Sequence, residues 1–169
     1  MTALRKIVEA DLDVLDRQRE SPEDSGEFAW YGYKAGGFRR RWEAREIFTE
    51  HMGALAVVDD DGNLVGDIGW IRTHNGPPPN GDCWNLGIWI VPEARGKGHG
   101  SSAQRLGAAY LFANTYLERV EAGTESGNVA EQKALEKAGF TREGVLRKAC
   151  FRDGEWRDMV VYSKLRGEP

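Results

Sequence analysis

The alternation of apolar and polar positions predicts a strand in the middle of this chain. Leu86, Ile88 and Ile90 recur with the two-residue period of a strand, and Pro92 then ends the ladder because it has no N–H to donate. From Ser101 onward the apolar residues recur at three- and four-residue steps, the stripe of a helix packed on a sheet. A strand, a glycine-rich turn and a helix are therefore predicted in succession.

The rest of the pattern predicts the remaining elements. Short apolar runs between turn residues predict strands over 4–8, 54–58, 64–71, 119–124, 144–151 and 156–165. Helices are expected over 10–19, 38–51 and 128–139, a loop or broken helix over 21–37, and an exposed loop over 74–82. The order β-α-α-β-β-β-α-β-α-β-β is typical of an α/β (α+β) fold, a mixed sheet with helices on both faces. Strand 119–124 is expected to run parallel to the central strand, because a helix crossover separates them.

Composition narrows the class of protein. A length of 169 residues suits a single domain over 1–169, and six Trp, six Phe and five Tyr argue against disorder. The net charge of −4 gives no support for binding nucleic acid, and no apolar run approaches the length of a membrane span. The N-terminus has no apolar signal core, so a cytoplasmic location is expected. Cys83 and Cys150 fit no metal spacing and are expected to be free thiols.

The glycine-rich turn is a candidate anion site. It reads Arg95-Gly96-Lys97-Gly98-His99-Gly100 and leads into the predicted helix. The start of a helix leaves four N–H groups without partners and carries partial positive charge. Residues without Cβ let those N–H groups approach a phosphate closely. A flexible turn is the structural alternative, but the strand before and the helix after it favour the anion site.

Two nucleotide-binding motifs resemble this turn. The segment Gly98-His99-Gly100-Ser101-Ser102-Ala103 also fits the dinucleotide fingerprint Gly-x-Gly-x-x-Ala, with Glu118 or Glu121 as the later ribose acid. That fingerprint lies directly after the first strand of a doubly wound sheet, whereas several residues and a strand-rich half precede this one. A Walker loop is excluded because glycine, and not Ser or Thr, follows Lys97.

The same residues carry a family resemblance. The segment Ile88-Trp89-Ile90-Val91-Pro92, followed by Arg95-x-x-Gly98-x-Gly100, resembles the acyl-CoA-binding motif of the GNAT N-acetyltransferase superfamily. Residues 128–140 are similar to the Asn-x-x-Ser…Leu-Glu-Lys-x-Gly-Phe segment of its RimJ/RimL-type branch, and residues 143–147 and Gly154-x-Trp156-x-Asp158 continue that pattern. Together the two matches cover about the C-terminal half of the chain.

The resemblance implies a GNAT-like, mostly antiparallel sheet and an acyltransferase. A primary amine, on a small molecule or a protein N-terminus, would attack the thioester of acetyl-CoA, or another short acyl-CoA, directly in a ternary complex. Strands four and five would splay, with the pantetheine between them. The residues that the resemblance places at the CoA are Ile88, Ile90, Arg95, Gly96, Lys97, Gly98, His99, Gly100, Ser101 and Asn128. Asn128 also fits a capping box with Glu131, a structural alternative.

The proton-handling group does not follow from the resemblance. Many GNAT enzymes place a Tyr acid four residues before the Gly of Gly-Phe, where this chain has Leu135. Where the RimJ/RimL branch often has Ser, this chain has Glu131. Glu131 and Glu125 are the candidate catalytic residues, with a surface or capping charge as the structural alternative and a chain of waters as the other route for the proton.

The amine site is predicted over the aromatic segment 28–42. Its glycines oppose a regular helix, and long irregular segments in compact domains are often functional. The candidate acceptor-binding residues are Trp30, Tyr31, Tyr33 and Trp42, with help from the 74–82 loop. A satellite aromatic cluster or a subunit contact, for example in a homodimer, is the structural alternative.

Two other functions are alternatives to amine acetylation. An acyl-CoA-binding sensor or interaction module of the same fold would show little turnover, and the missing Tyr acid keeps this alternative open. A dinucleotide-binding oxidoreductase is the third interpretation. No metal, nucleic-acid or membrane partner is expected.

Overall fold

The computed structural model describes residues 1–18, 20–31 and 37–169. The strands are β1 (Ala3–Arg5), β2 (Met52–Val58), β3 (Leu64–His74), β4 (Asp82–Ile90), β5 (Arg119–Glu125), β6 (Thr141–Arg152) and β7 (Glu155–Leu165). The helices are α1 (Leu12–Arg17), α2 (Pro22–Ser25), α3 (Gly37–Glu43), α4 (His99–Asn114) and α5 (Val129–Lys137), with 3-10 turns at Glu9–Asp11 and Pro92–Ala94.

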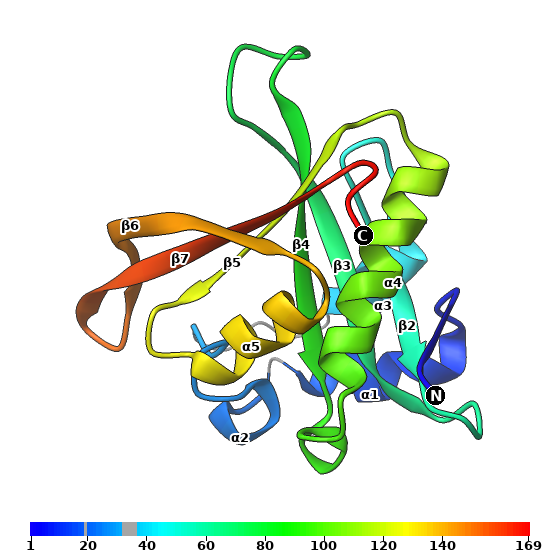
Figure 1. The fold of residues 1–169 in the computed structure, drawn as a ribbon. Coiled ribbons are helices and arrows are strands. Elements are labelled where there is room, and N and C mark those ends of the chain that lie inside the picture. The colour runs from blue at the N-terminus through cyan, green and yellow to red at the C-terminus, as the bar shows by residue number, and fades with distance from the viewer. Residues whose placement is uncertain (19, 32–36) are drawn as a thin grey trace.

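The described strands form one sheet in the order β1-β2-β3-β4-β5-β7-β6 (Figure 1). Neighbouring strands are antiparallel except β4 and β5, which are parallel and joined by the α4 crossover. The mixed, mostly antiparallel sheet is therefore confirmed, including the predicted parallel pair.

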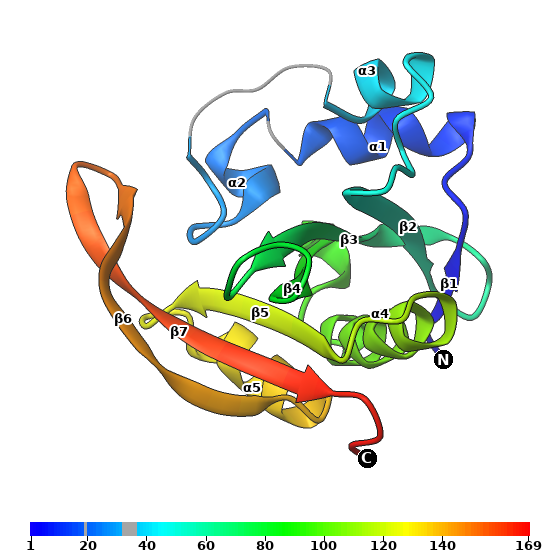
Figure 2. The same cartoon turned by 90° about the horizontal axis from the view of Figure 1, so that it is seen from above.

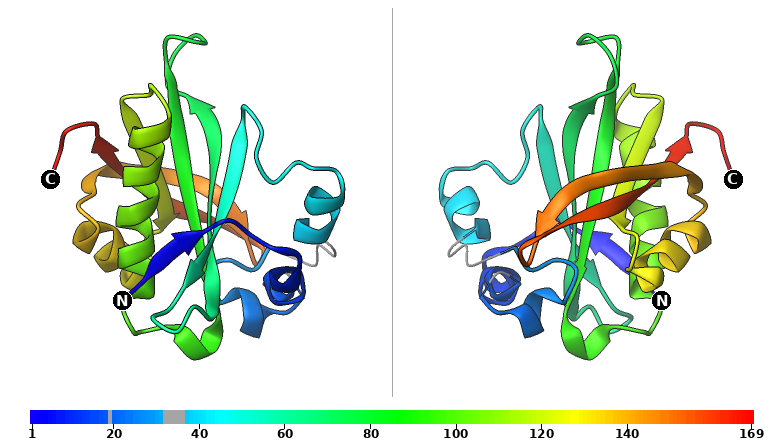
Figure 3. Two further views of the ribbon diagram at one scale, coloured as in Figure 1. Left: turned by 90° about the vertical axis from the view of Figure 1, so that its right-hand side faces the viewer. Right: turned by 90° about the vertical axis from the view of Figure 1, so that its left-hand side faces the viewer.

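The helices cover both faces of the sheet. Figure 2 shows α1, α2 and α3 on one side of the strands and α4 and α5 on the other, and Figure 3 shows the same two layers from the edges. Helix α4 packs close to the sheet at Gly107. A Cβ at this position would lie 2.5 Å from the side chain of Ile68 on β3. No helix in the described part of the chain is long and apolar enough to cross a membrane.

Several predicted boundaries were wrong for local reasons. The helix predicted over 38–51 ends at Glu43, because Arg45 adopts a left-handed conformation (φ 60°) and Phe48 forms a β-bridge with Gly53. The strand predicted over 4–8 is only Ala3–Arg5, since the chain turns where the N–H of Val8 donates to the Asp11 carboxylate. The broken helix expected over 21–37 contains the four-residue α2.

The parallel pair separates after a short start. Strand β4 pairs with β5 only from Trp84–Val120 to Leu86–Ala122. Beyond that point β4 stays on β3 and β5 stays on β7. We call this separation the fork, made of residues 87–90 of β4 and 123–125 of β5. It lies between the two helix layers and positions the candidate site.

Candidate active site

The β4 side of the fork presents backbone groups toward β5. The N–H of Val91 donates to the carbonyl of Val65, on the β3 side. Backbone groups of successive strand residues point to alternate sides, so those of Ile88 and Ile90 point into the fork. The carbonyl of Ile90 accepts a hydrogen bond from Nε of Arg95 at 2.9 Å. The backbone N–H and carbonyl of Ile88 therefore face the fork, where no described strand pairs with them. The Ile90 carbonyl faces the same side but already accepts from Arg95.

The glycine turn ends in an open helix N-terminus. Gly96 (φ 74°) and Gly98 (φ 85°) are left-handed, which glycine adopts readily, and α4 begins at His99. The first bond within the helix runs from the N–H of Ser102 to the carbonyl of Gly98, so the three N–H groups before it have no carbonyl in the helix. A Cβ on Gly96, Gly98 or Gly100 would meet nothing within 4 Å. A phosphate therefore has open access to these N–H groups.

The charged residues of the turn lie in different places. Arg95 points away from the helix start, because its Nη2 donates to the carbonyl of Asp24 at 2.6 Å and ties α2 to the end of β4. The side chain of Lys97 is exposed. A ring nitrogen of His99 lies 3.0 Å from Oγ1 of Thr2. His99 is the first residue of α4, so its backbone N–H is one of the free groups at the helix start.

Asn128 is the N-cap of α5. Its Oδ1 accepts the N–H of Glu131 at 3.2 Å, and its own N–H donates to the carbonyl of Glu125. The reciprocal half of the predicted capping box is wrong, because the Glu131 carboxylate turns away from Asn128. It accepts instead from Nε2 of Gln104, a residue of α4.

The two candidate carboxylates have different surroundings. Glu131 is half-buried, and burial raises its pKa while the Gln104 donor partly opposes that rise. Leu135, one turn further along α5, is fully buried. Glu125 is only 5% exposed, and both of its oxygens accept from the guanidinium of Arg152. Glu125 therefore holds the end of β5 to the β6–β7 hairpin.

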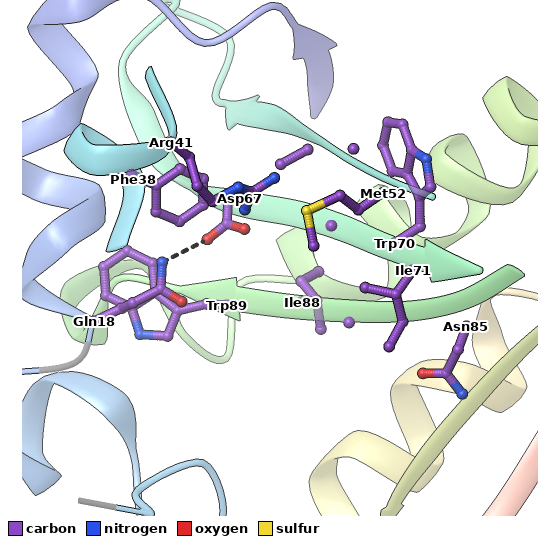
Figure 4. Close-up of a pocket in the computed structure, with 14 residues that line it drawn as sticks. Gln18, Phe38, Arg41, Met52, Asp67, Trp70, Ile71, Asn85, Ile88 and Trp89 are labelled. Atoms are coloured by element: carbon purple, nitrogen blue, oxygen red, sulfur yellow. Dashed lines mark hydrogen bonds between the residues drawn. The ribbon is translucent and has the colours of Figure 1, made fainter. Parts of the chain in front are cut away.

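A cavity of about 310 Å³ lies on the other face of the sheet, between β2–β4, helix α3 and Gln18, which directly follows α1 (Figure 4). Three cross-strand pairs of β3 and β4 form its floor: Asp67–Trp89, Gly69–Gly87 and Ile71–Asn85. The middle pair has no side chains, which leaves a hollow between the outer two. Since Gly87 is the first fork residue of β4, the cavity reaches the fork.

Polar side chains gather at one end of this cavity. Asp67 is 7% exposed, and its Oδ1 accepts from Nε2 of Gln18 at 3.1 Å. Arg41 lines the same end, lies over the Phe38 ring and donates to the carbonyl of Ile47 at 3.3 Å. Neither Asp67 nor Arg41 was predicted as a site residue. The signal available was Asp67 inside an apolar strand, with Gly69 two residues beyond it.

Trp30, Tyr31 and Trp42 are not among the described residues that line the cavity. Tyr31 is 57% exposed, and its hydroxyl lies 3.2 Å from the Cys150 thiol on β6. Trp30 is half-buried, and Trp42, on α3, is 36% exposed. Tyr33 lies outside the described residues.

Comparison with known proteins gives a family. The family model described as "Acetyltransferase (GNAT) domain" matches residues 2–141. The probable N-acetyltransferase YjcK of Bacillus subtilis (strain 168) is 31% identical over 128 residues, 76% of this chain and 67% of that protein. The uncharacterized N-acetyltransferase YokL of the SPbeta prophage in the same strain is 26% identical over 168 residues, 98% of this chain and 90% of that protein.

Solved structures give the same fold. Spermidine N-acetyltransferase from Vibrio cholerae, in complex with CoA and spermine, has a TM-score of 0.78 at 21% identity over 99% of this chain and 96% of that one. Ribosomal-protein-S5-alanine acetyltransferase from Vibrio fischeri has a TM-score of 0.75 at 20% identity over 98% and 93%. At these identities the likeness concerns the fold alone.

Proposed function

Because this chain belongs to the GNAT acetyltransferase family, we propose that it transfers acetyl from acetyl-CoA, or another short acyl group from its CoA thioester, to a primary amine. One observation carries the proposal: the fork joins an open helix N-terminus on one face of the sheet to a cavity on the other. The amine nitrogen attacks the thioester carbonyl carbon, the carbon–sulfur bond breaks, and CoA leaves as the thiol. Alignment of the two substrates is the main contribution of such a site.

The CoA side uses the residues expected from the motif. The N–H groups of residues 96–101 are proposed to bind the pyrophosphate, and the backbone of Ile88 the pantetheine in the fork. Asn128 is proposed to reach the pantetheine arm while it caps α5. Ile90 is also proposed to lie beside the pantetheine, and Arg95 fixes the end of β4 through its hydrogen bond to the Ile90 carbonyl. Lys97 is proposed to add positive charge beside the pyrophosphate.

The acceptor is proposed to enter the cavity from the α1–α3 face. Its volume lies at the small end of the range for small-molecule sites, so it suits a small amine or the first residue of a protein N-terminus. The names of similar structures include both classes, spermidine and a ribosomal protein. Trp30, Tyr31 and Trp42 are proposed to flank the approach to the cavity.

An acyl-CoA-binding module with little turnover is the second candidate, because Leu135 supplies no acid at the position where many relatives carry a Tyr. The two candidates share the CoA site and differ in catalysis. Binding of CoA and release of CoA thiol therefore have to be measured separately.

The test starts with calorimetric titration of CoA, acetyl-CoA and NAD. Gly100→Val is the variant of choice, because Gly100 has an ordinary φ and open space, so the branched side chain blocks the anion without straining the backbone. Loss of one or two charge-assisted hydrogen bonds weakens CoA binding about 10- to 100-fold. Gly144→Val, at an equally open glycine on β6, is the matched control and should bind normally.

Turnover is then followed as CoA release with spermidine and with peptides that carry a free N-terminus. Acetylated product with either class supports the transferase, and tight CoA binding with no product from any amine supports the module. Wild-type affinity in Gly100→Val, or binding of NAD in place of CoA, would overturn the CoA site.

A further inference from the structure

A buried amide on α4 has a polar atom without a partner. Gln104 is 2% exposed, and the α4 residues buried around it are Ala103, Gly107, Ala108 and Leu111. Its Nε2 donates to the Glu131 carboxylate, but its Oε1 has no hydrogen-bond partner within the described residues. An unsatisfied buried polar atom is costly, so an amide at this point of a small, apolar stripe calls for an explanation.

The Gln104–Glu131 pair lies on the path proposed for pantetheine. Gly100, in the open helix start, is one turn before Gln104 on the same face of α4, about 6 Å along the axis. Glu131 follows the cap residue Asn128 in the first turn of α5. Helices α4 and α5 lie side by side on the same face of the sheet (Figure 1). A pantetheine arm that runs from the α4 N-terminus past Asn128 to the fork is therefore proposed to pass close to this pair.

The charged groups of the neighbouring elements are engaged elsewhere. On β5, Glu125 is held by Arg152; on β6, Glu143 is held by Arg119. On α5 itself, Glu136 accepts from the Tyr162 hydroxyl, and Lys133 and Lys137 are exposed. On α4, His99 contacts Thr2 and Arg105 is exposed. Among the described residues, no salt bridge involves Glu131, so Gln104 is its recorded side-chain partner.

We propose that Glu131, positioned by Gln104, is the general acid that protonates the leaving CoA thiolate. This inference rests on the proposed acetyl transfer. As the carbon–sulfur bond breaks, its electron pair goes to sulfur, and the proton passes from the Glu131 carboxyl O–H to that sulfur. The resulting carboxylate takes up the proton that the acylated amine loses, directly or through water, so the cycle closes without another reactant.

An amide fits this task because it can serve both forms of the acid. Nε2 donates to the carboxylate, and after a 180° turn of the amide Oε1 accepts from the carboxylic O–H. The atom that lacks a partner beside the carboxylate thus gains one beside the acid. Burial favours the neutral acid, the form that has a proton to give. Glu131 lies one turn before Leu135 on the same face of α5, which also explains how the chain dispenses with a Tyr there.

The experiment measures kcat against pH with saturating acetyl-CoA and the best amine of the panel. For a general acid, kcat falls as pH rises through the pKa of Glu131. Glu131→Gln should lower kcat about 10²–10⁴-fold and abolish this fall at high pH (the basic limb of the pH profile), with an unchanged Kd for CoA. Gln104→Leu removes the hydrogen bonds to both forms, but the bond to the charged carboxylate is the stronger, so its loss raises the pKa of Glu131 and the fall in kcat should move to higher pH. Glu136→Gln, on the same helix, is the control and should keep the wild-type profile.

A second readout does not depend on turnover. In infrared spectra recorded over the same pH range, a protonated-carboxyl band should disappear as kcat falls, and this band should be absent in Glu131→Gln. A fall in kcat of less than about tenfold in Glu131→Gln, an unmoved limb in Gln104→Leu or the absence of that band would overturn the assignment. If the wild type acetylates no amine, both the proposed function and the acid assignment fail. If the wild type is active and Glu131→Gln and Gln104→Leu behave like the wild type, only the acid assignment fails.

Discussion

Removing the Glu125 carboxylate should lower the free energy of unfolding and leave the turnover of the folded protein unchanged. The Glu125 and Arg152 side chains are 5% and 6% exposed, and the pair closes β5 onto the β6–β7 hairpin. The guanidinium also donates to Asp153 and lies 5.5 Å from the centre of the Phe28 ring. Glu125→Gln leaves the guanidinium charge buried without its main counter-charge.

The size of the effect follows from that geometry. Removing one partner of a buried ion pair costs about 3–5 kcal/mol. Arg152 keeps the exposed Asp153 and the Phe28 ring, so the lower end, about 3 kcal/mol, is expected. In a domain of this size 1 kcal/mol corresponds to roughly 2–4 °C, so the melting temperature should fall by roughly 6–12 °C. The double variant Glu125→Leu, Arg152→Met leaves no unpaired charge and should recover part of the loss.

The assay is urea and thermal unfolding together with kcat at a temperature where every variant is folded. Glu155→Gln is the matched control, because its pair with Arg157 is on the surface and 3.1 Å apart; it should change stability by about 1 kcal/mol or less. A structural Glu125 predicts normal turnover per folded molecule. Wild-type stability in Glu125→Gln, or a stable variant whose kcat falls about 10²-fold or more, would refute the argument and restore Glu125 as the base.

Two further predictions concern the acceptor and the acid limit of stability. Gly87→Val adds a side chain where nothing lies within 4 Å, so it should fill the cavity floor and raise KM for the amine without changing Kd for CoA; if Trp30→Ala raises that KM and Gly87→Val does not, the aromatic segment binds the acceptor. Arg119, with Ser163, lowers the pKa of Glu143 from 4.5 to about 2. The stability that Glu143→Gln loses should therefore be fully present above about pH 4.5 and vanish as pH falls through about 2, and equal wild-type and variant unfolding curves at pH 7 would contradict this.

The strand–turn–helix was predictable because its signals are local. A two-residue period, a proline stop and three glycines each act within a few residues, and α4 begins in that turn at His99. The parallel course of β5 followed from the crossover alone. The start of α5 was also local, since Asn128 caps it, but the partner of Glu131 is 27 residues away in sequence, so no short motif could reveal it.

The cavity could not be predicted because it depends on register. Gly69 and Gly87 make a hollow only when they face each other across β3 and β4, and nothing in either strand alone fixes that pairing. Its walls come from Gln18 after α1, from α3 and from β2, whose positions are set by tertiary packing. The failed helix prediction over 38–51 has the same origin: Phe48 leaves the helix to pair with Gly53 and to pack against Trp70, which periodicity does not show.

The fork itself is the strongest argument for a ligand of peptide-like chemistry. A sheet that separates its central strands leaves backbone donors and acceptors unpaired, and a fold retains such an edge when something else pairs with it. Arg95 binds the Ile90 carbonyl, so the free backbone on the β4 side is reduced to the stretch around Ile88. Pantetheine carries amide groups and can pair with one strand residue much as an added strand would. Arg95, the arginine of the glycine-rich motif, then has a structural role. Because it occupies the carbonyl at the end of β4, the unpaired edge that remains is short enough for a chain with a few amide groups and too short for a polypeptide strand.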